Sequence, residues 1–265
     1  MNIIVCVKQV PDTTEVRIDP VTGTLIRDGV PSIINPDDKS ALEAALALKD
    51  NDKDIKVVVV SMGPPQADVA MREALAMGAD EAYLISGREY GGSDTWATSN
   101  IISEGIKYIS GLIGGYDIVM CGRQAIDGDT AQVGPQIAER LDLPQITYVQ
   151  DLKVEGDTIT AQRALEDGYQ VIEVKKPALI TCLKELNEPR YANMGGIFDA
   201  YAKEVKIISQ AELNVPAEKI GLKSSPTNVK KSFAAGVKGA GVVLQGSAKE
   251  VTEQLVENLK AKHII

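Results

Sequence analysis

Short runs of β-branched residues alternate with helical patterns along the first 140 residues, and this alternation constrains the fold more than any other feature. The clearest run is Ile55 to Val60, and a helical pattern from Gln66 to Met77 follows it and ends at Gly78. A continuous apolar run of this kind is typical of a parallel strand covered on both faces. Strands alternating with helices at this spacing form βαβ units. We therefore expect an α/β fold with a doubly wound, mostly parallel sheet and helices on both faces.

The other expected elements follow the same order along the chain. The expected parallel strands are Asn2–Val7, Ile55–Val60, Glu81–Ile85 and Asp117–Cys121, and the expected helices are Pro36–Lys49, Gln66–Met77, Trp96–Leu112 and Asp129–Arg140. Asn35 takes the cap position before Pro36. A hairpin is expected over Val16–Arg27. Five later runs are expected to form an antiparallel extension of the sheet: Gln145–Val149, Leu152–Glu155, Thr158–Arg163, Val171–Val174 and Ala178–Thr181.

The pattern changes after Lys184. Residues Asn187 to Tyr201 show no clean period and include Pro189, which predicts an ordered surface loop. From Glu212 onward the chain has too few apolar residues to form its own core. It is expected to end in a helix from about Ser247 to Lys262. We expect an α/β nucleotide-binding domain over residues 1–220 and a C-terminal arm over residues 221–265 that packs on another subunit.

Composition excludes several classes of function. A net charge of −9 and a pI near 4.8 argue against general binding to nucleic acid or acidic membranes. The three cysteines, Cys6, Cys121 and Cys182, form no CxxC pair, which disfavours a disulfide framework, a zinc site and an iron–sulfur site. The single histidine, His263, excludes Ser-His-Asp and Cys-His catalysis. No catalytic residue and no metal site is predicted. Neither a signal segment nor a membrane span is evident, so a cytoplasmic location without membrane insertion is expected.

The stretch from Tyr116 to Pro135, YDIVMCGRQAIDGDTAQVGP, reads as a strand, a polar loop and a helix. Such a junction offers backbone N–H groups and a helix dipole to a phosphate. Asp129 or Thr130 is expected to cap the helix. Asp127 and Asp129 would repel a phosphate, so we expect their carboxylates to turn toward backbone N–H groups.

Three other segments end strands or open helices at the same edge of the sheet, where ligands of doubly wound folds bind. The resulting candidate cofactor-binding residues are Cys6, Val7, Asn35, Asp37, Asp38, Ser61, Met62, Gly63, Gly122, Arg123, Gln124, Ala125, Ile126, Asp127, Gly128, Asp129, Thr130, Ala131, Gln132 and Val133. A second Gly-rich stretch, GGSDTWATS at residues 91–99, adds Ser93, Asp94, Thr95 and Thr98. Its alternative interpretation is a helix start that Asp94 simply caps. With no acid–base set, the chain is expected to hold a cofactor that performs the chemistry.

Seven segments resemble the beta subunit of electron-transfer flavoproteins, in matching order and spacing over essentially the whole length. They read CVKQVPDT, INPDDKSALEAAL, VVSMGPPQA, ALAMGADEAYL, GRQAIDGDTAQVGP, RALEDGYQVIEVKKPALIT and NEPRYANM. The resemblance implies a heterodimer with an alpha subunit that carries its own FAD. It also implies a nucleotide pocket in the beta subunit, which holds AMP in the simple form of the family and FAD in the electron-bifurcating form.

The GGSDTWATS stretch is similar to the bifurcating form, whereas the AMP-holding form differs there. The resemblance then implies that the FAD of this chain takes a hydride from NADH. One electron passes through the alpha-subunit FAD to an acyl-CoA dehydrogenase of the butyryl-CoA type, and the other reduces ferredoxin or flavodoxin. Whether the chain is an enzyme by itself stays open, since this activity belongs to the complex.

The NEPRYANM segment is similar to the loop by which the family docks on acyl-CoA dehydrogenases. This assigns Pro189, Arg190, Tyr191 and Met194 to partner binding, with Met194 as the apolar anchor. Two alternatives remain at this stage. One is a non-bifurcating beta subunit with structural AMP. The other is a nucleotide-binding sensor of the universal-stress type, which would have no alpha partner.

Overall fold

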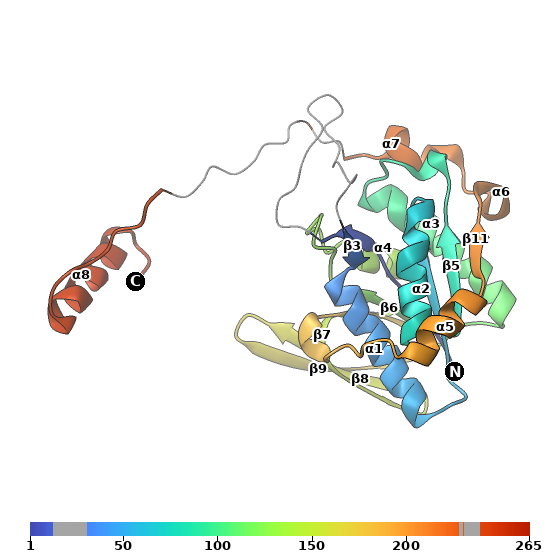
Figure 1. Ribbon diagram of the computed structural model, residues 1–265, viewed down its shortest axis with the longest axis horizontal. Coiled ribbons are helices and arrows are strands. Elements are labelled where there is room, and N and C mark those ends of the chain that lie inside the picture. Colours follow the sequence, from blue (N-terminus) through green and yellow to red (C-terminus); the bar gives the residue numbers. More distant parts are fainter. Residues whose placement is uncertain (13–30, 228–229, 231–238) are drawn as a thin grey trace. The chain divides into compact units, whose positions relative to one another are not determined.

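The computed structural model describes residues 1–12, 31–227, 230 and 239–265. Its main element is a nine-stranded sheet with the strand order β11-β5-β4-β1-β6-β10-β7-β8-β9 (Figure 1). The strands are β1 Asn2–Cys6, β4 Lys56–Met62, β5 Glu81–Ile85, β6 Ile118–Gly122, β7 Gln145–Glu155, β8 Thr158–Leu165, β9 Gly168–Lys175, β10 Ala178–Cys182 and β11 Val205–Ile208. A separate antiparallel pair joins β2 (Gln9–Pro11) to β3 (Ser32–Ile34). The expected hairpin at Val16–Arg27 lies outside the described residues.

Helices cover both faces of the parallel part of the sheet, as a doubly wound fold requires. The helices are α1 Pro36–Asn51, α2 Asp68–Met77, α3 Thr95–Ile113, α4 Val133–Arg140, α5 Met194–Ala202, α6 Gln210–Leu213, α7 Gly221–Ser224 and α8 Ala248–Ala261. Short 3₁₀ turns lie at Pro65–Ala67, Arg88–Tyr90, Lys184–Leu186 and Ala217–Lys219. The α/β class with a mostly parallel sheet is thus confirmed.

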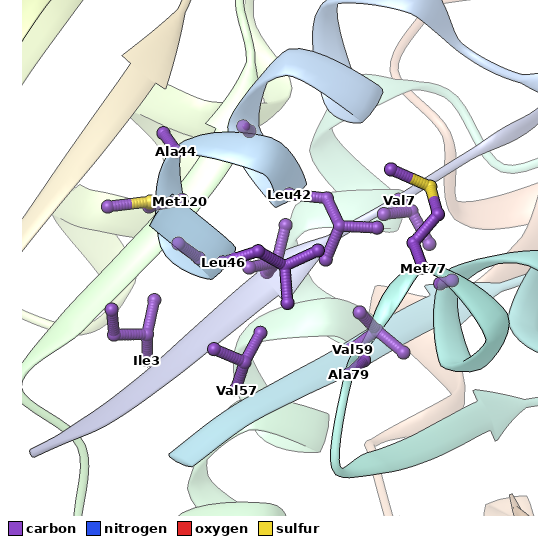
Figure 2. Close-up of a cluster of buried hydrophobic side chains, with 14 of the residues drawn as sticks. Ile3, Val7, Leu42, Ala44, Leu46, Val57, Val59, Met77, Ala79 and Met120 are labelled. Atoms are coloured by element: carbon purple, nitrogen blue, oxygen red, sulfur yellow. The ribbon is translucent and has the colours of Figure 1, made fainter. Parts of the chain in front are cut away.

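The two faces of the sheet build two separate cores. On one face, Leu42 and Leu46 of α1 contact β4 residues such as Val57 and Val59 (Figure 2). On the other face, α3 and α4 pack against the alternate strand residues, and the core there includes Ile106 of α3 and Val58 of β4. Because successive residues of a strand point to opposite faces, the run KVVVVSM contributes side chains to both cores. Each fully buried Val or Leu contributes about 1.5–3 kcal/mol to folding.

The position of strand β10 differs from the one expected from the sequence. Residues Ala178–Thr181 were expected in the antiparallel extension, yet β10 lies between β6 and β7 and runs parallel to both. All five of its residues are buried, as the continuous apolar sequence ALITC requires of a strand covered on both faces. The true antiparallel extension is β7-β8-β9. The two strands expected over 145–155 form one strand, β7, with an irregularity between Val149 and Asp151.

Two helix boundaries also differ from expectation. Helix α4 begins at Val133 rather than at Asp129, because Asp129 and Ala131 adopt left-handed conformations (φ 49° and 50°) that no α-helix can include. The segment expected as a loop over Asn187–Tyr201 is helical from Met194 onward. The Asn193 side chain caps this helix by accepting a hydrogen bond from the Gly196 N–H at 2.7 Å.

Contacts divide the chain into two units, residues 1–230 and residues 231–265. The second unit contains α8, which is closed at its start by a capping box between Ser247 and Glu250. Residues just beyond the expected domain boundary at 220 belong to the first unit, and the Thr227 N–H donates to the Asp94 carboxylate at 2.9 Å. The arm over 221–265 that packs on another subunit stays a prediction. None of the helices among the described residues is long and apolar enough to cross a membrane.

Candidate nucleotide-binding site

A cavity of about 690 Å³ opens at the carboxyl ends of the parallel strands. This volume lies within the ~300–1,000 Å³ range of ligand pockets. Its walls come from the ends of β1, β4 and β6, from the turn after β5, and from the first turns of α3 and α4. The position is the one that doubly wound sheets use for ligands.

The loop before α4 presents a row of backbone donors to this cavity. The backbone N–H groups of Thr130 to Gly134 donate to no acceptor in the described part of the chain, and all five residues line the cavity. Neither Asp129 nor Thr130 caps α4; Gln132 holds the cap position without a side-chain hydrogen bond. Unpaired backbone donors at the positive end of a helix dipole are the arrangement that suits an anion such as phosphate.

A buried asparagine holds the beginning of this loop. Asn35 is fully buried; its Nδ2 donates to the Gln124 carbonyl at 2.8 Å, and its Oδ1 accepts from the Ile126 N–H at 3.0 Å. Asn35 takes the expected cap position of α1, and it makes no side-chain cap hydrogen bond there because its amide is used across the sheet edge. Asn35 shapes the loop without lining the cavity.

The two carboxylates of the loop are also held by side chains. Asp127 forms an ion pair with the Lys8 Nζ at 2.6 Å, and Asp129 accepts from the Gln124 Nε2 at 2.8 Å. For Asp129 the expected backbone N–H partner is replaced by the Gln124 side chain. For Asp127 the Lys8 ion pair adds to the expectation, which stays a prediction. The result for a ligand is the same: neither residue lines the cavity, so the repulsion of a phosphate is reduced.

Asp38, in the first turn of α1, joins the ends of two neighbouring strands. Its carboxylate accepts from the Lys8 N–H after β1 and from the Gly122 N–H at the end of β6, both at 2.8 Å. Burial raises the pKa of Asp38 to about 7, and these two hydrogen bonds only partly oppose the shift. Asp38 also lines the cavity, so its charge state bears on any ligand there.

The raised pKa of Asp38 predicts a pH dependence of stability. Because the folded chain holds this proton more tightly than the unfolded chain, the stabilisation is complete below the ordinary value of 3.8 and is lost as pH rises to about 7. Urea unfolding of the wild type and of Asp38→Asn should be compared from pH 5 to pH 8. The stability of the variant relative to the wild type should rise by about 2 kcal/mol over this range. A constant difference would contradict the assignment.

Asp37 lies beside the cavity and contacts Arg123, which lines it. The Arg123 Nε is 3.4 Å from a buried oxygen of Asp37, and neither atom has a hydrogen-bond partner in the described residues. Burial raises the pKa of Asp37, and the Arg123 charge lowers it by a smaller amount. This long ion pair leaves the guanidinium able to turn toward an anion in the cavity.

The second Gly-rich stretch forms the far wall of the cavity. Asp94 caps α3 by accepting from the Ala97 N–H at 3.0 Å, and Ser93 Oγ donates to the Tyr90 carbonyl at 2.7 Å. Thr95 Oγ1 donates to Gln132 Oε1 at 2.8 Å, which joins the starts of α3 and α4. The cap interpretation is thus correct for Asp94, and the stretch nevertheless lines the cavity.

The structure gathers most of the predicted cofactor-binding residues at this one cavity. Those that line it are Cys6, Val7, Asp38, Met62, Gly63, Ser93, Asp94, Thr95, Thr98, Gly122, Arg123, Gln124, Ala125, Gly128, Thr130, Ala131, Gln132 and Val133. Those that support it from behind without lining it are Asn35, Asp37, Ser61, Ile126, Asp127 and Asp129.

Some lining residues stand in the segments expected at this edge without being candidate residues: Lys8, Pro64, Gly91, Gly92, Cys121 and Gly134. Sequence reasoning missed the others, which are Gln9, Ala67, Gly87, Arg88, Tyr90, Ile102 and Ile137. Arg88 and its neighbours follow the end of β5, which lies next to β4 in the sheet. Since Glu81–Ile85 was already expected as a parallel strand, the rule that ligands bind beyond strand ends was enough to identify them.

The predicted partner-binding segment exposes apolar side chains away from the residues that line the cavity. Arg190 anchors it, since its guanidinium and backbone N–H bind the Glu43 carboxylate and its Nη2 also contacts Asp50 at 2.7 Å. These hydrogen bonds raise the pKa of Arg190. Beyond the anchor, Tyr191 is 94% exposed and Met194 is 68% exposed. Pro189 lies in the extended chain before Arg190.

Comparison with known proteins decides the family. The model of the electron transfer flavoprotein domain matches residues 22–213. This chain belongs to the electron transfer flavoprotein family. It is 59% identical to the electron transfer flavoprotein subunit beta of Clostridium acetobutylicum and 58% identical to that of Thermoanaerobacterium thermosaccharolyticum, each over the full length of both chains. It is 55% identical, again over both full lengths, to the caffeyl-CoA reductase-Etf complex subunit CarD of Acetobacterium woodii.

These similarities make the chain a beta subunit of the family. Membership implies binding of a flavin or another nucleotide, and the subunit names of the relatives imply pairing with an alpha subunit. The universal-stress alternative is thereby removed. Among the described residues, no group of three or more His, Cys, Asp or Glu side chains is arranged to hold a metal ion.

Proposed function

We propose that this beta subunit binds FAD in the cavity at the sheet edge and serves electron bifurcation from NADH. The observation that carries the proposal is that the cavity extends from the loop Gly122–Gly134 to the turn Gly87–Thr98. A mononucleotide needs the phosphate loop and the strand ends, whereas the additional wall provides room for a second ring system. When bound, the FAD supplies hydride acceptance and the separation of a two-electron donor into single electrons.

The chain's own residues divide the binding task. The backbone N–H groups of Thr130 to Gly134 would hold the diphosphate, with the Arg123 guanidinium close by. The strand ends at Cys6–Val7 and Met62–Gly63 would contact the adenine. Thr95 and Thr98, at the positive end of α3, would contact the part of the cofactor beyond the diphosphate.

The alternative is a non-bifurcating subunit that holds structural AMP. The phosphate loop suits AMP as well as FAD, so the loop does not separate the two. The far wall favours FAD, because Ser93 to Thr98 form part of the same cavity rather than a distant helix start. The relative named as a subunit of a caffeyl-CoA reductase-Etf complex also supports an acyl-CoA-linked partner for this chain.

Cofactor analysis of the purified heterodimer tests this proposal. We expect two FAD per alpha–beta pair after extraction, and we expect NADH to reduce the flavin under anaerobic conditions. One FAD with one AMP would overturn the bifurcating function and leave the simple carrier. As a matched control, nucleotide is also extracted from the isolated alpha subunit. This measurement shows how much of the FAD in the heterodimer belongs to the alpha subunit and how much to the beta subunit.

The partners follow from the same proposal. The alpha subunit binds the C-terminal arm, residues 221–265, which includes the last helix α8. An acyl-CoA dehydrogenase of the butyryl-CoA type docks at Arg190–Met194 and takes one electron through the alpha subunit. Ferredoxin or flavodoxin takes the other electron.

A further inference from the structure

Two cysteines lie directly opposite each other on neighbouring strands at the floor of the nucleotide cavity. The register pairs Ile4 with Val119 and Val5 with Met120, so the next pair along β1 and β6 is Cys6 and Cys121. Adjacent strands are about 4.8 Å apart. This separation lies inside the ~4.4–6.8 Å range of Cα distances that a disulfide spans.

Both thiols also point to the same side of the sheet. Cys6 and Cys121 belong to the core under α3 and α4, and the nearby Cys6 thiol contributes to the raised pKa of Cys121. Both residues line the cavity, with 8% and 6% of their surface exposed. A small oxidant that enters the cavity therefore meets the wall that these two residues help to form.

The third cysteine provides an internal contrast. Cys182 is fully buried in the core of the opposite face and does not line the cavity. Its register partner on β6 is Gly122, so no thiol faces it there. Cys6 and Cys121 thus differ from Cys182 in two ways: they line the cavity, and each faces another cysteine across the strand pair.

We propose that Cys6 and Cys121 form an oxidation-sensitive dithiol that closes to a disulfide when the cavity is empty and is shielded when a nucleotide fills it. Peroxide is the oxidant. The Cys6 thiol takes the terminal oxygen of hydrogen peroxide and becomes a sulfenic acid, with release of one water. The Cys121 sulfur then attacks the sulfenic sulfur, the S–O bond breaks, and the hydroxyl leaves with the thiol proton as a second water.

The contact with Cys6 and burial raise the pKa of Cys121. The atoms balance in the same way whichever of the two thiols takes the oxygen first. The shielding half of the proposal rests on the nucleotide placement proposed above. The disulfide half rests only on the strand register and the cavity.

Peptide mass spectrometry of the full-length chain tests the disulfide. After peroxide treatment without added nucleotide, we expect one cross-linked peptide pair that contains Cys6 and Cys121, and a loss of two of the three free thiols. Cys182→Ala should keep the cross-link, and Cys121→Ser should trap a sulfenic acid on Cys6 that dimedone labels. Separate sulfinic or sulfonic acids on Cys6 and Cys121, or oxidation of Cys182 alone, would overturn the proposal.

A second arm of the experiment adds FAD or AMP before the peroxide. We expect the cross-linking rate to fall several-fold with nucleotide present. Cross-linking at an unchanged rate would support the dithiol and count against the nucleotide placement, so the two proposals fail separately. Because the wild-type chain itself is measured, a folding defect in a variant does not affect the result.

Discussion

Replacing Gly122 with alanine should abolish tight nucleotide binding and destabilise the fold. A methyl group at this position would lie 2.6 Å from the Asp38 backbone N and 2.7 Å from the Asp37 carbonyl carbon, and it would also meet the Asp38 carboxylate. Backbone atoms cannot move aside as a side-chain end can, so β6 and the start of α1 must separate. The Gly122–Asp38 hydrogen bond then breaks, and the phosphate loop that follows Gly122 shifts with it.

We expect a loss of about 1–3 kcal/mol in the free energy of unfolding, the range of overpacked cores. Nucleotide affinity should fall at least ~10-fold. A tenfold loss of affinity needs a loss of only about 1.4 kcal/mol of binding free energy, which is within the expected cost of the shifted loop. Calorimetric titration and urea unfolding measure the two effects. Gly128→Ala in the same loop is the stability control, because a methyl group there meets no protein atom within 4 Å. Nucleotide binding by Gly122→Ala at wild-type strength would show that the loop does not hold the phosphates.

The placement of the cavity could be predicted from the sequence because it depends on strand order alone. Short apolar runs that end in Val7, Met62 and Gly122 were enough to bring three loops to one edge. The conformation of the loop after Gly122 could not be predicted. Asp129 and Ala131 adopt positive φ without being glycines, and nothing in their local sequence signals it. Tertiary bonds from Asn35 and Lys8, distant in sequence, hold the loop in that shape.

The helix α5 was missed for a different physical reason. Gly195 and Gly196 normally weaken a helix by about 1 kcal/mol each, so the segment read as a loop. In the structure Gly196 lies against the Ala76 carbonyl of α2, where a Cβ would not fit. The glycine thus permits close contact between α5 and α2 and does not end the helix. Only the position of α2 in space explains this residue.

Replacing Met194 with glutamate should slow electron transfer to the acyl-CoA dehydrogenase at least ~10-fold and leave nucleotide binding unchanged, because a charge on an apolar anchor opposes docking. Met194 is the first residue of α5, far along the chain from the cavity loop, and it lies near the exposed Tyr191 and Phe198. A carboxylate in the first turn of a helix is favourable by about 0.3–1 kcal/mol, so the variant should stay folded.

The measurement is the steady-state rate of dehydrogenase reduction by the heterodimer at several dehydrogenase concentrations. The loss should appear as a raised half-saturating concentration, because docking rather than flavin chemistry is affected. Leu112→Glu is the matched control: Leu112 is 58% exposed on α3 and lies outside the partner-binding segment. Met194→Leu should retain the wild-type rate, since the apolar contact is kept. Equal rate losses in Met194→Glu and Leu112→Glu would indicate a general effect of added negative charge and remove the partner-docking role from Arg190–Met194.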